Sequence, residues 1–326
     1  MSRSASQPID TDSHLAGHQP VPSIEPPTSD TCVSMVPMRD ETVSVLENRL
    51  LAGGHYLLSL DAPWQAAAAR PGQFAMVRIL DRSDVLLRRP MSIFDLQSAN
   101  PQSARNHRPP FGVLQLLYKV VGRGTGLMAE LKPGDQAGLL APLGHGFFEE
   151  EYLPRLGKGD EVILVAGGIG IAALLLPAKH LAGAGVKQRL FFGARTKDDL
   201  VGTSEFKPLV RALLLATENG SVGYRGFVTR PLEEYLTKHT GRRFLIMACG
   251  PWPMLRATFD LAKRFRHHCL VSMENRMGCG LGVCLGCSIR VQGTGHEAYQ
   301  RVCTEGPVFW AEKIVWDAGK ELGIRD

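Results

Sequence analysis

The chain has 326 residues, of which 44% are hydrophobic and 21% charged, and its formal net charge is +5. This composition excludes collagen-like, coiled-coil and wholly disordered proteins, and at about 150 residues per domain the length predicts two or three domains. No run of lysine and arginine is interleaved with aromatic residues, so we expect no nucleic-acid partner. The longest apolar run, Val162–Leu176, has 15 residues. A membrane-spanning helix needs about 20, so we expect no membrane association.

Residues 1–40 are rich in proline and serine and contain no aromatic residue. Such a segment cannot bury enough apolar surface to offset the entropy of ordering it. We therefore predict a disordered N-terminal tail that lies outside the fold. The beginning of the chain also lacks the apolar core of a secretory signal, so the expected location is cytoplasmic.

Residues 41–155 contain short stretches in which apolar and polar residues alternate. The clearest are 41–47, 55–60 and 74–80, and a longer β-rich run covers 113–121. Pro-Gly pairs lie between these stretches and mark turns. Several short strands separated by turns predict an antiparallel β-sandwich or β-barrel.

The pattern changes in residues 156–271. A continuous apolar strand, Glu161–Ala166, leads into Gly167-Gly-Ile-Gly170, and helical spacing follows over 171–182. Beyond it we predict strands at 188–192 and 243–248 and helices at 204–214, 231–238 and 253–265. Strands that alternate with helices are typical of a parallel-sheet α/β domain.

Residues 272–326 are dominated by glycine and cysteine and are too short for a hydrophobic core of their own. Cys279, Cys284, Cys287 and Cys303 have the spacing C-x4-C-x2-C-x15-C. Three thiolates in one loop and a distant fourth match the plant-type ferredoxin arrangement for a [2Fe–2S] cluster. A zinc site is the alternative, although zinc commonly uses two C-x2-C pairs and this segment has one. The cysteines at 32 and 269 are interpreted as uninvolved.

Two glycine-rich turns follow predicted strands. Gly168-x-Gly170-x-x-Ala173 meets the dinucleotide-binding pattern, but it lacks the acidic residue expected about 20 positions later, which leaves a purely structural turn as the alternative. Cys249-Gly250-Pro251 lies between another strand and a helix. Ligands bind beyond the carboxyl ends of parallel strands, so both turns are predicted to line one nucleotide crevice.

In the first domain, Arg89-Pro90-Met91-Ser92 follows a predicted strand. Arginine offers several donors to a diphosphate, and a serine hydroxyl can bond to a flavin or phosphate. The string is short, and taken alone it also fits an exposed loop.

Together, these motifs in chain order resemble the ferredoxin–NADP reductase superfamily. The cysteine cluster, Tyr118-Lys-Val-Val-Gly-Arg-Gly-Thr-Gly126, Pro142-Leu-Gly-His-Gly-Phe147 and the flanking segments 274–279 and 303–309 narrow the resemblance. They are similar to the electron-transfer subunits of class B, NAD-linked dihydroorotate dehydrogenase. The similarity covers about residues 41–316. It implies an FAD-binding β-barrel (41–155), an NAD-binding α/β domain (156–271) and a [2Fe–2S] domain with a C-terminal extension (272–326).

The resemblance also implies roles for single residues. FAD would be bound by Arg89, Pro90, Met91, Ser92, Tyr118, Lys119 and Val120, with Gly124 and Thr125 at its diphosphate. Gly168, Gly170 and Gly250 would line the nicotinamide crevice, with Cys249 as a small packing residue near the ring. The four cysteines of the C-x4-C-x2-C-x15-C pattern would bind the cluster.

The implied function is that of an oxidoreductase subunit in de novo pyrimidine (UMP) synthesis. Electrons from a partner subunit, which contains FMN and oxidises dihydroorotate, would pass through [2Fe–2S] and FAD to NAD⁺. A heterotetramer of two subunit pairs is implied, with no dihydroorotate site on this chain and a contact surface around 278–286. Arg195 and Lys197 could also meet the 2′-phosphate of NADP, and the preference for NAD comes from the resemblance.

Two alternatives remain. One is a related subunit of a sulfide dehydrogenase, a hydrogenase or an NADH-dependent ferredoxin–NADP reductase. The other is a non-enzymatic binding module stabilised by metal.

Overall fold

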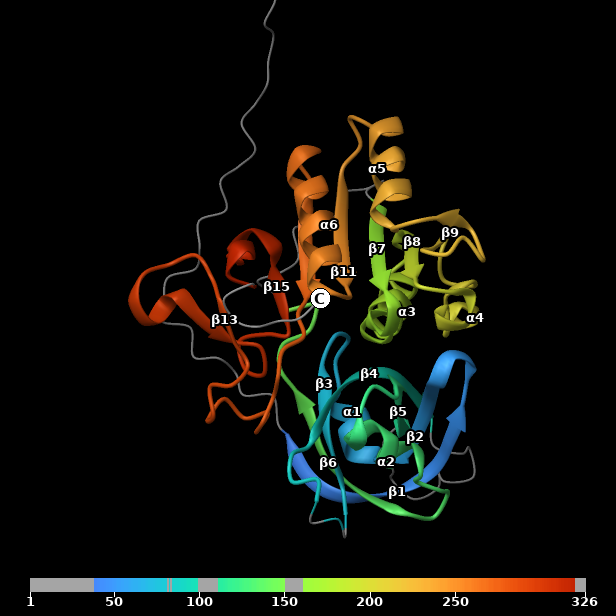
Figure 1. The fold of residues 1–326 in the computed structure, drawn as a ribbon, viewed down its shortest axis with the longest axis vertical. Helices are drawn as coiled ribbons and strands as arrows, with labels where there is room; N and C mark the ends of the chain where they lie inside the picture. The colour runs from blue at the N-terminus through green and yellow to red at the C-terminus, as the bar shows by residue number, and fades with distance from the viewer. Residues whose placement is uncertain (1–37, 81, 83, 99–110, 150–160, 320–326) are drawn as a thin grey trace, which may run out of the picture. The chain divides into compact units, whose positions relative to one another are not determined.

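The structure is a computed structural model that describes residues 38–80, 82, 84–98, 111–149 and 161–319. These residues form a β-barrel, a parallel-sheet region and a C-terminal cysteine segment (Figure 1). Most of the predicted tail and the predicted domain boundary at 155/156 lie outside the described residues. No helix in the described ranges is long and apolar enough to span a membrane.

The first region is a closed antiparallel barrel, which confirms the predicted class. Its strand order is β1-β2-β5-β4-β3-β6, so neighbours in sequence are not always neighbours in space. Alternate residues such as Leu58, Leu60 and Leu114 fill the interior, as period-two strands require. The strands are β1 (Arg39–Leu50), β2 (His55–Asp61), β3 (Phe74–Ile79), β4 (Arg89–Ser98), β5 (Phe111–Lys119) and β6 (Gln136–Leu143), with two short helices, α1 (Pro63–Ala68) and α2 (Arg123–Ala129).

The second region is a seven-stranded sheet with the order β10-β9-β8-β7-β11-β12-β15. All its pairs are parallel except β12 with β15. Its strands are β7 (Glu161–Gly167), β8 (Lys187–Ala194), β9 (Ala212–Thr217), β10 (Tyr224–Arg225), β11 (Phe244–Cys249), β12 (His268–Ser272) and β15 (Val308–Trp310). The strands β7, which is apolar after Glu161, and β11, which is apolar throughout, are central because both of their faces are buried.

Helices cover both faces of this sheet, as in a doubly wound α/β fold. On one face, α3 (Leu175–Gly183) and α4 (Thr203–Phe206) pack through Leu175, Leu181 and Phe206. On the other face, α5 (Thr229–Lys238) and α6 (Trp252–Arg264) pack through leucines such as Leu232 and Leu255.

Three sequence predictions in these regions are wrong in detail. The helix predicted over 204–214 stops at Phe206, and the leucines that follow belong to β9, which pairs with β8. Pro208 explains the early end, because it has no N–H group to donate the next hydrogen bond of the helix. The motif Arg89–Ser92 does not follow a strand but forms the first four residues of β4. In addition, a 3₁₀ helix (Gly168–Ala173) precedes α3, where one continuous helix was predicted.

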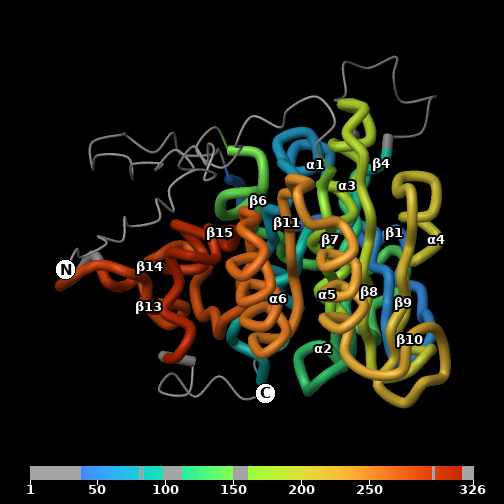
Figure 2. The backbone as a smooth tube through the Cα atoms, turned by 90° about the horizontal axis from the view of Figure 1, so that it is seen from above, coloured from blue at the N-terminus to red at the C-terminus, as the bar shows by residue number. Residues whose placement is uncertain are grey.

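The C-terminal segment adds little regular structure of its own. It contains the small sheet of β13 (Ser288–Arg290) and β14 (Tyr299–Arg301), and it contributes β15 to the edge of the large sheet. Beyond β15, Trp316 stacks on Phe259 of α6, with ring centroids 5.7 Å apart. Figures 1 and 2 both show this red segment beside the β15 edge. The segment is therefore held by the core of the α/β region.

Two ion pairs connect the barrel to the α/β region. Lys179 of α3 donates to both carboxylate oxygens of Asp95 on β4, at 2.5 and 2.7 Å. Lys119, at the end of β5, pairs with Asp199 in the 3₁₀ turn after β8.

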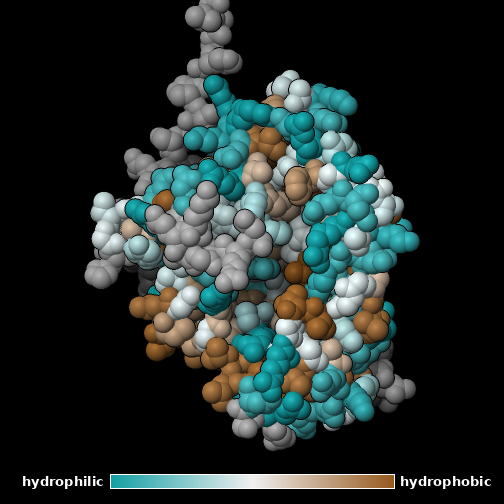
Figure 3. All heavy atoms as spheres, viewed as in Figure 1, coloured by the Kyte–Doolittle hydropathy of each residue, from teal (hydrophilic) through white to brown (hydrophobic). Residues whose placement is uncertain are grey.

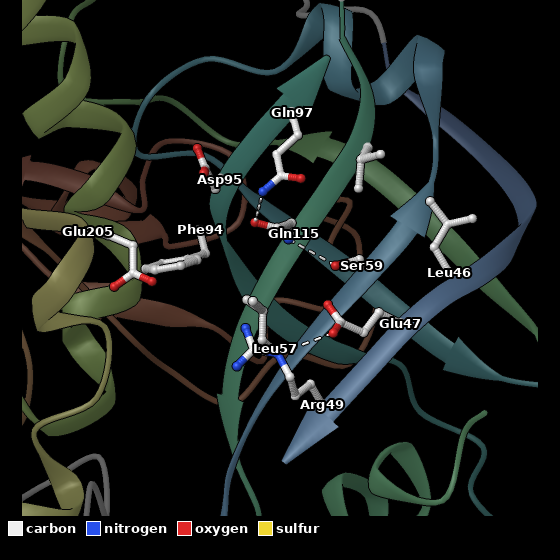
Figure 4. A pocket seen from close by; sticks show the side chains of 11 residues that line it. Leu46, Glu47, Arg49, Leu57, Ser59, Phe94, Asp95, Gln97, Gln115 and Glu205 are labelled. Carbon is white, nitrogen blue, oxygen red and sulfur yellow. Dashed lines mark hydrogen bonds and ion pairs between the residues drawn. The ribbon is translucent and has the colours of Figure 1, made fainter. Parts of the chain in front are cut away.

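A cavity of about 380 Å³ lies beside Asp95 on the flank of the barrel (Figure 4). The buried side-chain amide of Gln115 lines this cavity and hydrogen-bonds to two other lining residues, Gln97 and Ser59.

We expect Asp95→Asn to lower the free energy of unfolding by about 1 kcal/mol, because Lys179 loses a charged acceptor but remains open to solvent. Urea denaturation followed by circular dichroism measures this change. The control is Glu47→Gln in the exposed Glu47–Arg49 pair, which we expect to cost less than about 0.5 kcal/mol. Equal losses of unfolding free energy in the two variants would contradict the conclusion that Asp95–Lys179 is the more stabilising ion pair.

Candidate cofactor sites

The two predicted glycine turns meet at the carboxyl edge of the parallel sheet. Strands β7 and β11 are neighbours, and Cys249 is in register with Ala166. A Cβ added to Gly170 would lie 2.4 Å from the carbonyl oxygen of Cys249. A Cβ on Gly250 would lie 2.9 Å from the Cα of Gly167. The structure thus brings the turns into direct backbone contact, with Gly168 beside them, at the place where a parallel sheet binds nucleotides.

The Cys249 thiol is buried at the end of β11 and hydrogen-bonds to Ser272 at the end of β12. Burial raises its pKa strongly, and the nearby Glu274 adds to the effect. A thiol that stays protonated is a poor nucleophile. The geometry therefore agrees with a packing role for Cys249.

On the barrel, the register of β3 and β4 shows which way the Arg89–Ser92 motif faces. Ser92 pairs with Phe74, and Pro90 pairs with Met76. Phe74 and Met76 belong to the core shared with the α/β region and the cysteine segment. Paired residues point to the same side of a sheet, so Pro90 and Ser92 face outward toward that core. Met91 instead packs against the barrel interior, so its side chain is turned away from this surface.

Arg89 lies against the first turn of α2. A Cβ on Gly124 would fall 1.9 Å from the Arg89 Nε atom, so only glycine allows this approach. Within the described ranges, the Arg89 side chain has no hydrogen bond or ion pair. The Thr125 hydroxyl accepts a hydrogen bond from the Val121 N–H at 2.9 Å and donates one to the Gly122 carbonyl at 3.0 Å. An uncommitted guanidinium beside the N–H groups of a first helical turn fits a diphosphate.

The three residues Tyr118, Lys119 and Val120 are placed less favourably for a flavin. Tyr118 is buried in the barrel core, and its hydroxyl donates to Oδ1 of Asn48 at 3.1 Å. The Lys119 amine is committed to Asp199. Only Val120 is substantially exposed. The buried side chain of Tyr118 departs from the expected flavin contact, because period two turns that position inward.

The four cysteines of the predicted cluster are brought together as two pairs. The Cys279 and Cys284 thiols are hydrogen-bonded to each other, and so are those of Cys287 and Cys303. In the part of the chain that the structure describes, no group of three or more His, Cys, Asp or Glu side chains is arranged around one metal ion. Two thiol pairs fit a cluster with two metal atoms.

The surroundings favour the thiolate form that metal binding needs. Burial opposes ionisation of Cys279, but hydrogen bonds from the Cys284 and Leu281 backbones lower its pKa to about 7. The hydrogen bond with Cys303 lowers the pKa of Cys287 to about 6, and the same bond raises the pKa of Cys303. The surroundings of Cys279 and Cys287 therefore favour the thiolate form that a metal requires.

The cysteine loop packs directly on the barrel. A Cβ on Gly280, whose φ is +76°, would lie 2.7 Å from Cγ of Met76 and 3.3 Å from Cδ1 of Leu143. Met76 is one strand away from Pro90, and neighbouring strands are about 5 Å apart. The loop thus lies next to the outward face of β4. Sequence analysis missed Met76 and Leu143, since nothing distinguishes them from other apolar strand residues.

Comparison with known proteins identifies the same regions. Residues 164–260 match an oxidoreductase NAD-binding domain, and residues 274–315 match the iron-sulfur cluster binding domain of dihydroorotate dehydrogenase B. The chain is 36% identical to a dihydroorotate dehydrogenase B (NAD(+)) electron transfer subunit of Desulforamulus reducens, over 84% of this chain and 97% of that protein. It is 37% identical to the corresponding subunit of Bacillus caldolyticus, over 84% and 98%.

The fold is also similar to that of a solved NADH-dependent reduced ferredoxin-NADP oxidoreductase, with a TM-score of 0.70 and 28% identity over 86% of this chain and 91% of that one. Barrel, parallel sheet and cysteine segment together define a ferredoxin reductase-like, NAD-dependent flavin oxidoreductase. Within that class, the chain belongs to the family of dihydroorotate dehydrogenase B electron transfer subunits.

Gly170→Ala tests the contact between the glycine turns. The new methyl group must push the turns apart. At a cost of about 1–3 kcal/mol, the Kd for NADH should rise about fivefold or more. Isothermal titration calorimetry measures this affinity. Flavin and iron–sulfur absorbance should be unchanged. Gly183→Ala, which meets nothing within 4 Å, is the control and should bind NADH normally.

Arg89→Gln tests the proposed diphosphate contact. Losing a charge-assisted hydrogen bond is worth about 1.5–3 kcal/mol, so we expect FAD affinity to fall about tenfold or more. The measurement is FAD binding to deflavinated protein by fluorescence quenching. The control is Arg123→Gln, since Arg123 is already paired with Asp84. An undiminished affinity in the Arg89 variant would remove this residue from the FAD site.

Proposed function

We propose that this chain transfers electrons from an FMN-containing dihydroorotate dehydrogenase catalytic subunit to NAD⁺. Its family supports the general role, that of an NAD-linked oxidoreductase subunit in pyrimidine synthesis. The observation that carries the proposal is the packing of Gly280 on Met76, which places the cysteine loop one strand from the β4 motif. When bound, [2Fe–2S] would exchange single electrons and FAD would couple them to the hydride that NAD⁺ accepts.

The residues of this chain would hold these groups in order. Cys279, Cys284, Cys287 and Cys303 would bind the cluster. Arg89, Gly124 and Thr125 would hold the FAD diphosphate, while Pro90 and Ser92 would border the isoalloxazine ring from the outward face of β4. The contacting turns at Gly168, Gly170 and Gly250 would bind the nicotinamide nucleotide. Their shared placement on one framework would fix the spacing between the groups.

The partner would contact the rim of the cysteine loop. Leu281, Val283 and Leu285 are 42%, 80% and 62% exposed, unusual for three apolar residues within five positions. Figure 3 shows hydrophobic residues gathered in this region, at the lower left of the view. A partner that covers the rim would remove this apolar surface from water and exclude solvent from the cluster. The heterotetramer of two pairs, the absence of a dihydroorotate site on this chain and the cytoplasmic location remain predictions from the sequence.

Reconstitution tests the proposal. We expect the purified chain, mixed with an FMN-containing dihydroorotate dehydrogenase catalytic subunit, to support orotate formation from dihydroorotate with NAD⁺. Cys284→Ser should abolish this activity and the cluster absorbance but leave NADH oxidation by an artificial dye acceptor largely intact, because Cys284 is distant from the FAD residues of the barrel in sequence and is largely exposed.

Cys269→Ala is the matched control. Cys269 is buried in the core outside the cysteine loop, so this variant should retain both activities. Failure of the wild-type chain to form orotate with the catalytic subunit, despite a full complement of flavin and cluster, would favour a different electron donor.

A further inference from the structure

Arg301, the last residue of β14, connects the two parts of the cysteine site. Its Nη1 donates to the carbonyl oxygen of Gly282 at 3.0 Å. Gly282 lies between Cys279 and Cys284 in the loop, and Arg301 lies two residues before Cys303. A single guanidinium thus ties the three-cysteine loop to the strand that leads to the fourth cysteine.

The residue that Arg301 binds through its carbonyl oxygen also contacts a cluster sulfur through its N–H group. The backbone N–H of Gly282 donates a hydrogen bond to the Cys303 thiol. At the same residue, φ is +79°, and an added Cβ would lie 2.8 Å from Cγ2 of Thr304 and 3.0 Å from Nη1 of Arg301. Only glycine fits between these neighbours. The hydrogen bond from Arg301 therefore holds the residue whose N–H group bonds to a cluster sulfur.

Glu305 fixes the guanidinium in this position. Its Oε2 accepts hydrogen bonds from the Arg301 backbone N–H at 2.6 Å and from Nε at 3.0 Å, and its Oε1 pairs with Nη2. This two-pronged contact leaves Nη1 free for Gly282. Through Gly282, whose N–H group bonds to the Cys303 sulfur, the guanidinium is held next to a cluster ligand.

We propose that Arg301, held by Glu305, is a positioning residue of the cysteine loop and that its charge raises the reduction potential of the bound [2Fe–2S] cluster. The proposal rests on the cluster assignment made above. Reduction adds a negative charge to the cluster, and a nearby cation stabilises the reduced form. The hydrogen bond from Gly282 to the Cys303 sulfur acts in the same direction, because it also stabilises added negative charge.

The test is the midpoint potential of the cluster in the full-length, cofactor-loaded chain, measured by a redox titration followed by electron paramagnetic resonance. Arg301→Gln should shift the potential to a more negative value. Glu305→Gln should shift it to a more positive value, because it removes a negative charge while the amide oxygen can still accept a hydrogen bond from Arg301. Arg301→Lys keeps the charge without the fork of donors, so its shift should be smaller than that of Arg301→Gln. Arg225→Gln, on the opposite edge strand of the large sheet, is the charge-matched control and should leave the potential unchanged.

Opposite shifts in the two glutamine variants support the proposal, since a loss of local order alone would move both potentials in the same direction. Shifts of the same sign, or no shift in either variant, overturn it. If Arg301→Gln does not retain the cluster, Arg301→Lys takes its place in the comparison. A negative shift in Arg301→Lys and a positive shift in Glu305→Gln then support the proposal, and shifts of the same sign or no shifts overturn it. Absence of a [2Fe–2S] signal in the wild-type chain would instead contradict the cluster assignment on which the proposed function depends.

Discussion

The close approach of the cysteine loop to the barrel wall is the constraint on which the proposed electron path depends. Electron transfer needs short distances, and here the distance is set by a glycine with positive φ at position 280, resting on Met76 and Leu143. Any side chain at that position would lift the loop away from β3 and from the neighbouring β4 motif. The barrel therefore contributes more than an FAD-binding surface, because its outer wall also seats the loop that carries three of the four cysteines.

A similar backbone approach organises the proposed nucleotide site. The turns after β7 and β11 touch without intervening side chains, with Gly170 against Cys249 and Gly250 against Gly167. Parallel pairing of the two strands brings the turns to the same edge. The buried Cys249 thiol adds volume rather than reactivity, which agrees with a family in which bound cofactors supply the chemistry.

The C-terminal segment is not an independent domain in its packing. It is anchored by β15 in the large sheet, by Trp316 on α6 and by the backbone bond from the His145 N–H to the Gly306 carbonyl, at 2.6 Å. These contacts join it to both the α/β region and the loop after β6. They explain how a segment with little regular structure can hold four cysteines in fixed positions. They also give a structural basis for expecting the potential of the bound cluster to respond to Arg301 and Glu305.

The sequence by itself determined the elements that are marked by a pattern of residues close together in the chain. The C-x4-C-x2-C-x15-C spacing, the glycine turns and the period-two strands identified the cofactor classes, the barrel and most of the parallel sheet. It failed where the outcome depends on distant partners. The leucines of β9 were predicted as helix because only pairing with β8 makes them a strand. The FAD role of Tyr118 stays a prediction, and the structure adds that its side chain is buried in the barrel interior. The contacts of Gly280 with Met76 and of Arg301 with Gly282 were decided by tertiary structure alone, because Met76 and Arg301 belong to no motif and are far from these glycines in sequence.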